Sequence, residues 1–320
     1  MLRSTMLAAC VLAAAAAPAS AQQAYPDKPV KIVVAYTAGQ GTDVASRYFA
    51  EQLSKVLGQT FYVENRGGAG GNIGTDIAAR AAPDGYTLTM GTNATHALNQ
   101  FLYPTMTYDA ERDFEPIALV ATFPMALLAG GDSAFKSVPD VLAAARAKKG
   151  AADVGMPSTT ARLVLELLKE QTGAPLFGVP YKGSSTAMTD VIGKQIPLTI
   201  DTVAAARPQV AGGKVKVLGV TSRKPTELLP GAPTIASQGV DGFEVIAWNA
   251  LYAPKGTPPE IVARLNQAIN QILSQPATRK HLLQMGYEPA GGSAQDLADF
   301  ARAERRKWQP IIKKAGIRAG

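Results

Sequence analysis

The sequence predicts an α/β protein of two lobes, built on a largely parallel sheet and joined by two crossing segments. Strand, loop and helix follow one another repeatedly between residues 28 and 91, an order typical of wound parallel sheets. A second series with the same order runs between residues 138 and 220. The apolar stretch at residues 114–129 lacks a helical pattern, so we expect a strand that crosses between the lobes. Near residues 243–253 we expect a further pair of strands as the return crossing. The length of 320 residues is also typical of two domains.

The first strand and helix predict a binding site for an anion. Residues 30–35 form a β-branched apolar run, short enough for a strand buried on both faces. After a glycine-containing turn, Thr42 and Asp43 occupy the position of a helix N-cap. The helix then has an apolar stripe at Val44, Tyr48, Phe49, Leu53, Val56 and Leu57. Its free N–H groups and positive dipole end would attract an anion. We assign Asp43 to capping, because its charge would oppose a bound carboxylate.

The other elements follow from the same signals of period, turn and cap. In the first lobe we expect a small-residue helix that ends near residue 81, between strands at 60–64 and 86–91. In the second we expect helices at 138–148, 158–171 and 184–192, and strands at 153–155, 176–179, 198–200 and 215–220. The tail is helical, with apolar stripes over 261–273 and 297–311 and a helix start at Pro276. We expect lobe 1 to comprise residues 25–123 and 251–320, and lobe 2 residues 124–250.

Residues 1–21 have the pattern of a signal peptide. Arg3 precedes an apolar segment, and Ala19-Ser20-Ala21 is a small-residue cleavage site. The segment is too short to span a bilayer, so we expect an exported protein. Cys10 follows a lipobox-like Leu-Ala-Ala, but almost no apolar segment precedes it, so we favour cleavage after about Ala21 over lipidation. Such cleavage removes the only cysteine, and with it any disulfide or thiolate chemistry.

Composition and spacing disfavour several classes of function. The net charge is +7, but Lys and Arg are scattered, whereas nucleic-acid binding calls for a dense basic stripe with aromatic side chains. No His, Asp or Glu cluster has the spacing of metal ligands. Gly39 and Gly41 after a strand approach a dinucleotide-binding pattern, but Val44 replaces its third glycine. The glycine run at 67–74 lacks the Lys of a P-loop, and tight turns with positive φ explain it better. We therefore expect no cofactor and no metal.

A secreted hydrolase is the alternative of a different class. The chain has two histidines and no G-x-S-x-G elbow. His281 lies among the tail helices, and His96 lies in a loop that we place at the cleft, without a serine marked as its partner. Catalysis is therefore disfavoured, and we do not expect an enzyme.

Four polar loops lie where predicted strands reach their carboxyl ends: residues 36–42, 92–96, 158–160 and 201–202. In open α/β sheets, ligands bind outside the carboxyl ends of the strands. The four loops together therefore predict one ligand site.

Seven motifs in order resemble one family of receptors. They are Tyr25-Pro-Asp-Lys-Pro-Val, Gly41-Thr-Asp43, the stretch from Val63 to Gly74, Ala82-Pro-Asp-Gly-Tyr86, Val179-Pro-Tyr-Lys-Gly183, Ala247-Trp248 and Ala253-Pro-Lys-Gly-Thr-Pro258. The chain resembles the TctC/Bug-type extracytoplasmic solute-binding receptors of tripartite tricarboxylate transporters from Tyr25 to about Ile317. The resemblance implies a two-lobed periplasmic-binding-protein (type II) fold with a central cleft, no catalysis and a small carboxylate or related organic ligand.

The resemblance also implies a set of ligand-binding residues, a location and partners. Main-chain amides and ordered water hold the ligand's carboxylate in this family, and its loops map onto Tyr36, Thr37, Ala38, Gly39, Gln40, Gly41, Thr42, Thr92, Asn93, Thr95, His96, Ser158, Thr159, Thr160, Arg162, Asp201 and Thr202. We expect a monomeric periplasmic protein that closes by a hinge near Phe123 and Trp248 and delivers its ligand to membrane transporter subunits. A receptor for an extracytoplasmic sensor is the alternative within this class.

Two loops depart from the family pattern. The first family loop usually reads Pro-Pro-Gly-Gly-Gly or similar, whereas residues 37–41 here are Thr-Ala-Gly-Gln-Gly. The second-lobe loop is shorter than usual and ends in Arg162 rather than His. Arg162 would clamp a second carboxylate if it faced the cleft. Both departures fall in the expected pocket, so the identity of the ligand does not carry over.

Overall fold

The computed structural model describes residues 25–314 and 316–318. The expected signal peptide and Cys10 lie outside these residues. In chain order, the first part contains β1 (Val30–Val34), α1 (Gly41–Leu57), β2 (Phe61–Asn65), the 3₁₀ turn η1 (Ala69–Gly71), α2 (Asn72–Ala79), β3 (Thr87–Thr92), the π-helical turn η2 (Ala94–Leu98) and α3 (Asn99–Leu102). The long strand β4 (Phe114–Gly130) follows.

The second part repeats the alternation of helix and strand. It contains α4 (Val138–Ala147), β5 (Val154–Met156), α5 (Thr159–Thr172), β6 (Gly178–Pro180), α6 (Ser184–Ile192), β7 (Leu198–Thr202), α7 (Val203–Ala211), β8 (Val215–Val220) and the 3₁₀ turn η3 (Ala236–Gln238). The chain returns through β9 (Ile246–Pro254) and ends with α8 (Pro259–Ser274), α9 (Pro276–Met285), β10 (Glu288–Gly291) and α10 (Ala294–Lys314).

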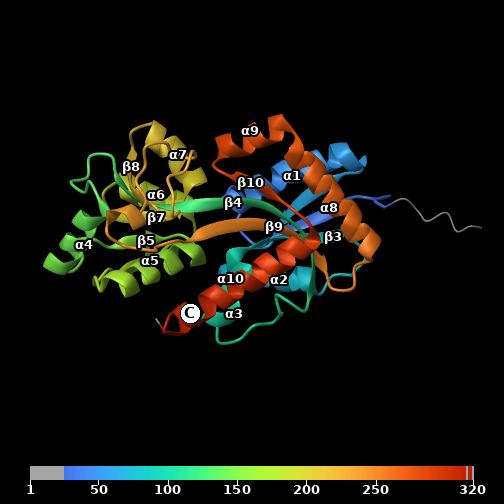
Figure 1. Cartoon of the computed structure of the whole chain (residues 1–320), viewed down its shortest axis with the longest axis horizontal. Coiled ribbons are helices and arrows are strands. Elements are labelled where there is room, and N and C mark those ends of the chain that lie inside the picture. Colours follow the sequence, from blue (N-terminus) through green and yellow to red (C-terminus); the bar gives the residue numbers. More distant parts are fainter. Residues whose placement is uncertain (1–24, 315, 319–320) are drawn as a thin grey trace, which may run out of the picture.

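One sheet runs through both lobes, and β4 and β9 form its centre. The strand order is β2-β1-β3-β9-β4-β7-β5-β6, with β8 and β10 also paired to β4. In Figure 1 these two central strands run side by side between the part with α4–α7 and the part with α1, α2 and α8. β4 pairs with β9 as far as Pro124 and with β7 from Met125. The predicted crossing over residues 114–129 is therefore one continuous strand.

The sheet is less parallel than the sequence predicts. The pairs of β1 with β2 and β3, and of β5 with β6 and β7, are parallel. Both crossing strands, however, are antiparallel to their neighbours. A strand that leaves one lobe and a strand that returns to it run in opposite directions, which explains the difference. The return crossing is the single strand β9, where we expected a pair of strands.

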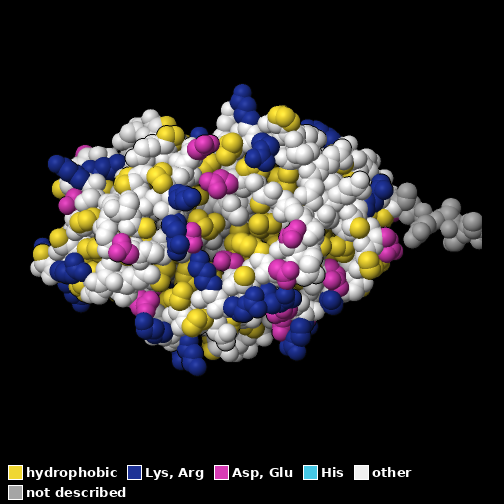
Figure 2. All heavy atoms as spheres, in the orientation of Figure 1, with side chains coloured by type: hydrophobic (Ala, Val, Ile, Leu, Met, Phe, Trp, Pro, Cys, Tyr) yellow, Lys and Arg dark blue, Asp and Glu magenta, His cyan; other side chains and the backbone are white. Residues whose placement is uncertain are grey.

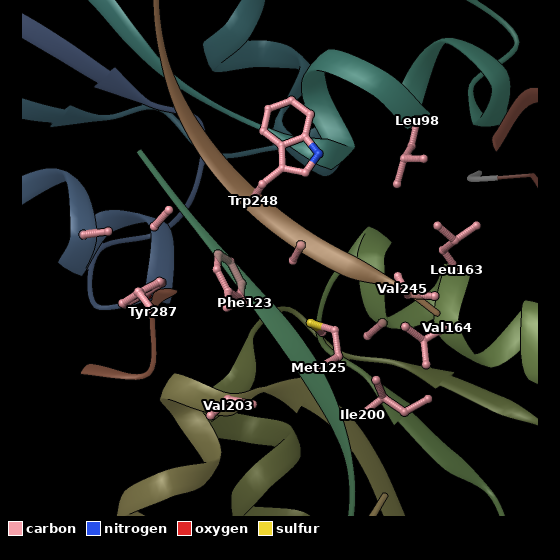
Figure 3. Packing of buried hydrophobic residues seen from close by; sticks show 14 of the residues in the cluster. Leu98, Phe123, Met125, Leu163, Val164, Ile200, Val203, Val245, Trp248 and Tyr287 are labelled. Carbon is pink, nitrogen blue, oxygen red and sulfur yellow. The ribbon is translucent and has the colours of Figure 1, made fainter. Parts of the chain in front are cut away.

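The core lies around the middle of the sheet. Every residue of β4 from Phe123 to Gly130 is buried, as expected for a strand covered on both faces. Figure 3 shows Phe123 and Met125 of β4 and Trp248 of β9 within this core. The ring of Phe123 meets that of Tyr287 edge-on, with centroids 5.0 Å apart. The C-terminal segment thus packs against the strand that joins the lobes.

Candidate functional site

Two adjoining cavities lie between the lobes. The inner cavity has a volume of about 70 Å³, and the outer cavity has a volume of about 460 Å³. Tyr36, Gln40, Pro157, Ser158 and Thr159 line both of them. Roughly 10–15 Å³ of such space suffices for a water, so the inner cavity can take a carboxylate-sized group with a few waters.

The N-terminus of α1 forms one wall of the inner cavity, through Gly41 and Thr42. The helix begins at Gly41, and its N-cap lies two residues before Thr42, the first residue of the cap that we predicted. The N-cap is Gln40, whose side chain makes no capping hydrogen bond, so the first N–H groups of this 17-residue helix have no intrahelical partner. Asp43 faces away from the site: its carboxylate accepts from the N–H of Gly39 (2.8 Å) and the amide of Asn65 (2.8 Å).

The N-terminus of α5 forms the facing wall, contributed by the second lobe. Ser158 is the N-cap, and its hydroxyl accepts from the N–H of Ala161 at 3.1 Å. The N–H groups of Thr159 and Thr160 remain without an intrahelical partner. The Thr160 hydroxyl donates to Oδ1 of Asn93 at 3.3 Å, and this buried hydrogen bond links the two lobes.

Asp201 brings a carboxyl group into the same cavity from the end of β7. Its side chain is 1% exposed. Oδ1 accepts from the Ser184 hydroxyl (2.8 Å) and from the N–H of Thr202 (2.7 Å), whereas Oδ2 has no partner. Burial in this poorly solvated site raises the pKa of Asp201 to about 6.

Tyr36 and Thr92 close the side of the inner cavity that belongs to the first lobe. Their hydroxyls share a hydrogen bond of 2.8 Å. Burial raises the pKa of Tyr36 to about 12, so the phenol stays neutral. Thr92 N–H donates to the hydroxyl of Thr95 at 3.0 Å, and this bond fixes the turn after β3. Among the described residues that line the inner cavity, none is Lys, Arg or His.

The outer cavity carries positive charge. Arg162 and Lys182 line it from the second lobe, opposite the glycine loop of residues 67–71. Nε of Arg162 is buried without a partner, so the side chain faces this cavity rather than open solvent. The lobes approach closely here: a Cβ placed on Gly183 would lie 2.8 Å from Nε2 of Gln40.

The structure brings most of the predicted site residues together. The inner cavity is lined by Tyr36, Gln40, Gly41, Thr42, Thr92, Asn93, Ser158, Thr159, Thr160, Asp201 and Thr202. Thr37 and Arg162 line the outer cavity only. Ala38, Gly39, Thr95 and His96 line neither of the two cavities.

His96 lies in the core of the first lobe, away from the cleft. Its ring is fully buried and stacks on Tyr252, with centroids 4.0 Å apart and planes at 14°. The ring of Phe114 also packs against the His96 ring, with centroids 4.8 Å apart. Burial lowers the pKa of His96 to about 3, so the ring is neutral. We therefore leave His96 out of the binding site proposed below.

Several cavity residues escaped prediction. Ser184, Phe123 and Met125 line the inner cavity, and no motif in the sequence singles them out. Trp248, which we expected near the hinge, lines the cavity and is fully buried. The glycines of residues 67–71 line the outer cavity, and Gly68, Gly70 and Gly71 also have positive φ. These glycines therefore form tight turns, as predicted, and also line the wall of the outer cavity.

Three further features concern metal binding, membrane helices and surface charge. Within residues 25–314 and 316–318, no group of three His, Cys, Asp or Glu side chains could hold a metal ion. No helix in that part of the chain is long and apolar enough to cross a membrane. On the face shown in Figure 2, Lys and Arg side chains are scattered among Asp and Glu rather than gathered into a stripe.

Sequence comparison identifies one family. The family described as "Tripartite tricarboxylate transporter family receptor" (TctC) matches residues 45–317. A Pseudomonas sp. (strain P51) protein, described as the UPF0065 protein in the tcbD-tcbE intergenic region, is 36% identical over 99% of this chain and 96% of its own length. Protein BugT of Bordetella pertussis is 32% identical over 95% of this chain and 94% of its own length.

Solved structures agree with the sequence matches. Rpa4515 of R. palustris, solved with adipate, is 37% identical with a TM-score of 0.88, over 92% of this chain and 99% of that one. MatC of Rhodopseudomonas palustris, solved with bound malate, is 30% identical with a TM-score of 0.84, over 90% and 100% of the two chains. The periplasmic binding protein BugD is 34% identical with a TM-score of 0.85, over 92% of this chain and 99% of that one. These likenesses establish the two-lobed solute-binding fold, and the chain belongs to the family of tripartite tricarboxylate transporter receptors.

Proposed function

We propose that this protein is a periplasmic receptor that captures a small organic carboxylate between its lobes and delivers it to the membrane subunits of a tripartite tricarboxylate transporter. One observation carries the proposal: the first turns of α1 and α5, which keep N–H groups without an intrahelical partner, face a single cavity from opposite lobes. Two helix N-termini provide N–H donors and positive dipole ends for one anion. The adipate and malate bound to relatives of the chain support the same ligand class.

The two cavities suggest how a ligand would divide between them. One carboxylate fits the inner cavity, and the remainder of the molecule extends into the outer cavity toward Arg162. Charge-assisted hydrogen bonds contribute about 1.5–3 kcal/mol each, whereas micromolar affinity corresponds to about 8 kcal/mol. Three or four N–H or hydroxyl donors with some apolar contact thus suffice, without a basic side chain in the inner cavity.

We propose that the lobes are residues 25–123 with 251–320, and residues 124–250, and that they close as units. The change of partner along β4 after Pro124 supports a hinge at Phe123, and Trp248 lies on the return strand beside it. Family membership supports a transporter as the partner, a monomeric receptor without catalytic activity, and a signal peptide over residues 1–21.

A comparison of carboxylates with their neutral amides tests the function. Adipate, malate and hexanoate would be screened beside adipamide, malamide and hexanamide for a shift in melting temperature. A carboxylate at 100 times its Kd adds about 2.7 kcal/mol of stability, and its amide adds none because the donors lack an anionic partner. Equal shifts from acids and amides, or no shift from any carboxylate, would refute the proposal.

A further inference from the structure

Asp201 places a carboxyl group in the cavity that we assign to a carboxylate of the ligand. It lines the inner cavity and is 1% exposed, and its Oδ2 is buried without a partner. Its Oδ1 already accepts two hydrogen bonds, from Ser184 and from the N–H of Thr202. The free oxygen is therefore the one available to a ligand.

No basic side chain of the inner cavity balances the charge of Asp201. Tyr36 is the other titratable group among the described lining residues, and it is neutral. On β4 the residue opposite Asp201 is Ala126, and β5 adds only Val154, Gly155 and Met156.

The charged groups on the neighbouring helices have other contacts. Asp43 of α1 pairs with Arg47. Asp190 of α6 accepts from the hydroxyl of Tyr181 at 2.8 Å. Arg207 of α7 donates to the carbonyl of Leu283.

Two more titratable groups belong to this neighbourhood. Arg162 of α5 lines the outer cavity rather than the inner one. The buried hydroxyl of Tyr287 lies behind Gly41, where a Cβ would be 2.8 Å away. The pKa of this phenol is raised by burial, so it also brings no charge. Asp201 and a ligand carboxylate would thus meet in one small space without a cation between them.

Two carboxylates that share a buried site cannot both remain ionised, because their like charges repel in a medium of low dielectric constant. One proton between them removes the repulsion and supplies a hydrogen bond. That proton belongs on Oδ2, since Oδ1 is occupied by two donors. We propose that Asp201 binds the ligand as a neutral carboxylic acid, whose Oδ2–H donates to the ligand's carboxylate, so that one proton is taken up with each ligand. This inference rests on the proposed carboxylate function.

The protonation equilibrium of Asp201 itself favours this arrangement. Burial already raises the pKa of Asp201 to about 6, so protonation near neutral pH requires little free energy. An incoming carboxylate raises the pKa further. The proton comes from solvent, and no bond other than this O–H forms.

The inference predicts a specific dependence of affinity on pH. Above pH 6 the free protein has lost the proton that the complex holds, so Kd rises about tenfold per pH unit. Below pH 6 the dependence levels off, because both states hold the proton. A ligand bound to an ionised Asp201 through its own ammonium or hydroxyl group would show no such rise.

Calorimetric titration of the full chain with adipate and with malate, between pH 6 and 8.5, tests the inference. Titrations at pH 8 in buffers of different ionisation enthalpy count the protons exchanged, and we expect an uptake of about one per ligand. The Asp201→Asn variant should bind as well at pH 8 as at pH 6, since its amide donates without titrating. The exposed Asp241→Asn variant should keep the slope of the unmodified protein.

Binding without proton uptake and without a rise of Kd with pH would overturn the inference while leaving the carboxylate receptor intact. Loss of binding by a folded Asp201→Asn variant at every pH would also overturn it, because the ligand would then be the donor. The proton count uses the unmodified protein, so the test stands even if the variant fails to fold. If neither these acids nor any other carboxylate binds at all, the proposed function fails first.

Discussion

Arg162 places a positive charge in the outer cavity, about where the far end of an extended ligand would lie. Its Nε is buried without a partner, and the residue lines that cavity beside Lys182. A guanidinium in this setting can bind a second carboxylate through two parallel hydrogen bonds. At the level of residues, we therefore propose that Arg162 makes the site selective for dicarboxylates.

Arg162→Ala should weaken adipate binding by about 1.5–3 kcal/mol, roughly ten- to a hundredfold in Kd, because one charge-assisted contact is lost. Hexanoate, which has the same chain length and a single carboxylate, should change less than threefold. Calorimetric Kd values for both ligands provide the measurement, and Lys149→Ala, an exposed lysine that lines neither cavity, is the control. An equal loss for both acids would contradict this role.

His96 predicts a separate effect of pH on stability. Its folded pKa of about 3, lowered by burial and by Arg305, lies below the usual value of 6.5. Between these values the unfolded chain binds the extra proton, so the His96 contribution falls as pH falls from 6.5 toward 3. Asp201 acts in the opposite direction: its pKa of about 6 is raised, so its contribution is present at low pH and is lost as pH rises through 6.

The two effects overlap between about pH 4 and 6, so the unmodified protein alone does not separate them. His96→Gln keeps a polar side chain that does not titrate, and it should lose less stability than the unmodified protein between pH 6.5 and 4. Urea unfolding at several pH values measures the difference. Parallel pH profiles for the two proteins would show that His96 is not neutral in the folded state.

At the level of elements, the sequence predicts well where one periodic signal dominates. The bounds of α6 and β8 agree with the prediction at both ends, and α9 begins at Pro276 as expected. Helix α7 was missed because it buries only Val203 and Ala206 and has Pro208 inside it, so neither a stripe nor an unbroken helical run is visible. β10 was missed because its four residues include a proline and a glycine.

The position of the candidate site was predictable from the order of strands and loops. Loops at the carboxyl ends of strands converge in this kind of sheet whatever their side chains are, so most of the predicted residues line one of the two cavities. The sequence did not indicate which way each side chain of these loops points. The π-helical turn at Ala94–Leu98 rotates His96 into the core, and nothing in Thr-Asn-Ala-Thr-His announces such a turn.

Gly74 fixes how closely α2 packs against β1. A Cβ at this position would lie 2.4 Å from the carbonyl oxygen of Arg66 and 2.8 Å from Cα of Ala35. Gly74→Ala should therefore reduce the free energy of unfolding by about 1–3 kcal/mol through overpacking. Urea unfolding measures the loss, and Ile77→Ala, on the same helix and 39% exposed, should cost less. An unchanged stability for Gly74→Ala would mean that helix and strand separate easily.

At the level of the whole molecule, the lobes touch around the inner cavity. The Thr160–Asn93 hydrogen bond crosses between them, Gln40 approaches Gly183, and Arg207 donates to the carbonyl of Leu283. Contacts of this kind exist only when the lobes are together, so they add to the free energy of closure.

Asn93→Ala should weaken carboxylate binding by about 0.5–1.5 kcal/mol, up to roughly tenfold in Kd, because one hydrogen bond of the closed form is lost. Small-angle scattering should show that more ligand is needed to reach the compact state. The exposed Gln195→Ala, in the turn before β7, is the control. If the Asn93→Ala protein binds and closes like the unmodified one, the Thr160–Asn93 hydrogen bond does not stabilise the closed form.

A crystal structure of the protein with adipate tests the central claim most directly. We expect one carboxylate in the inner cavity, within about 2.7–3.2 Å of N–H groups in the first turns of α1 and α5, and the other carboxylate toward Arg162. Adipate bound outside the space between the lobes, or held there only by basic side chains with both helix N-termini unused, would contradict it.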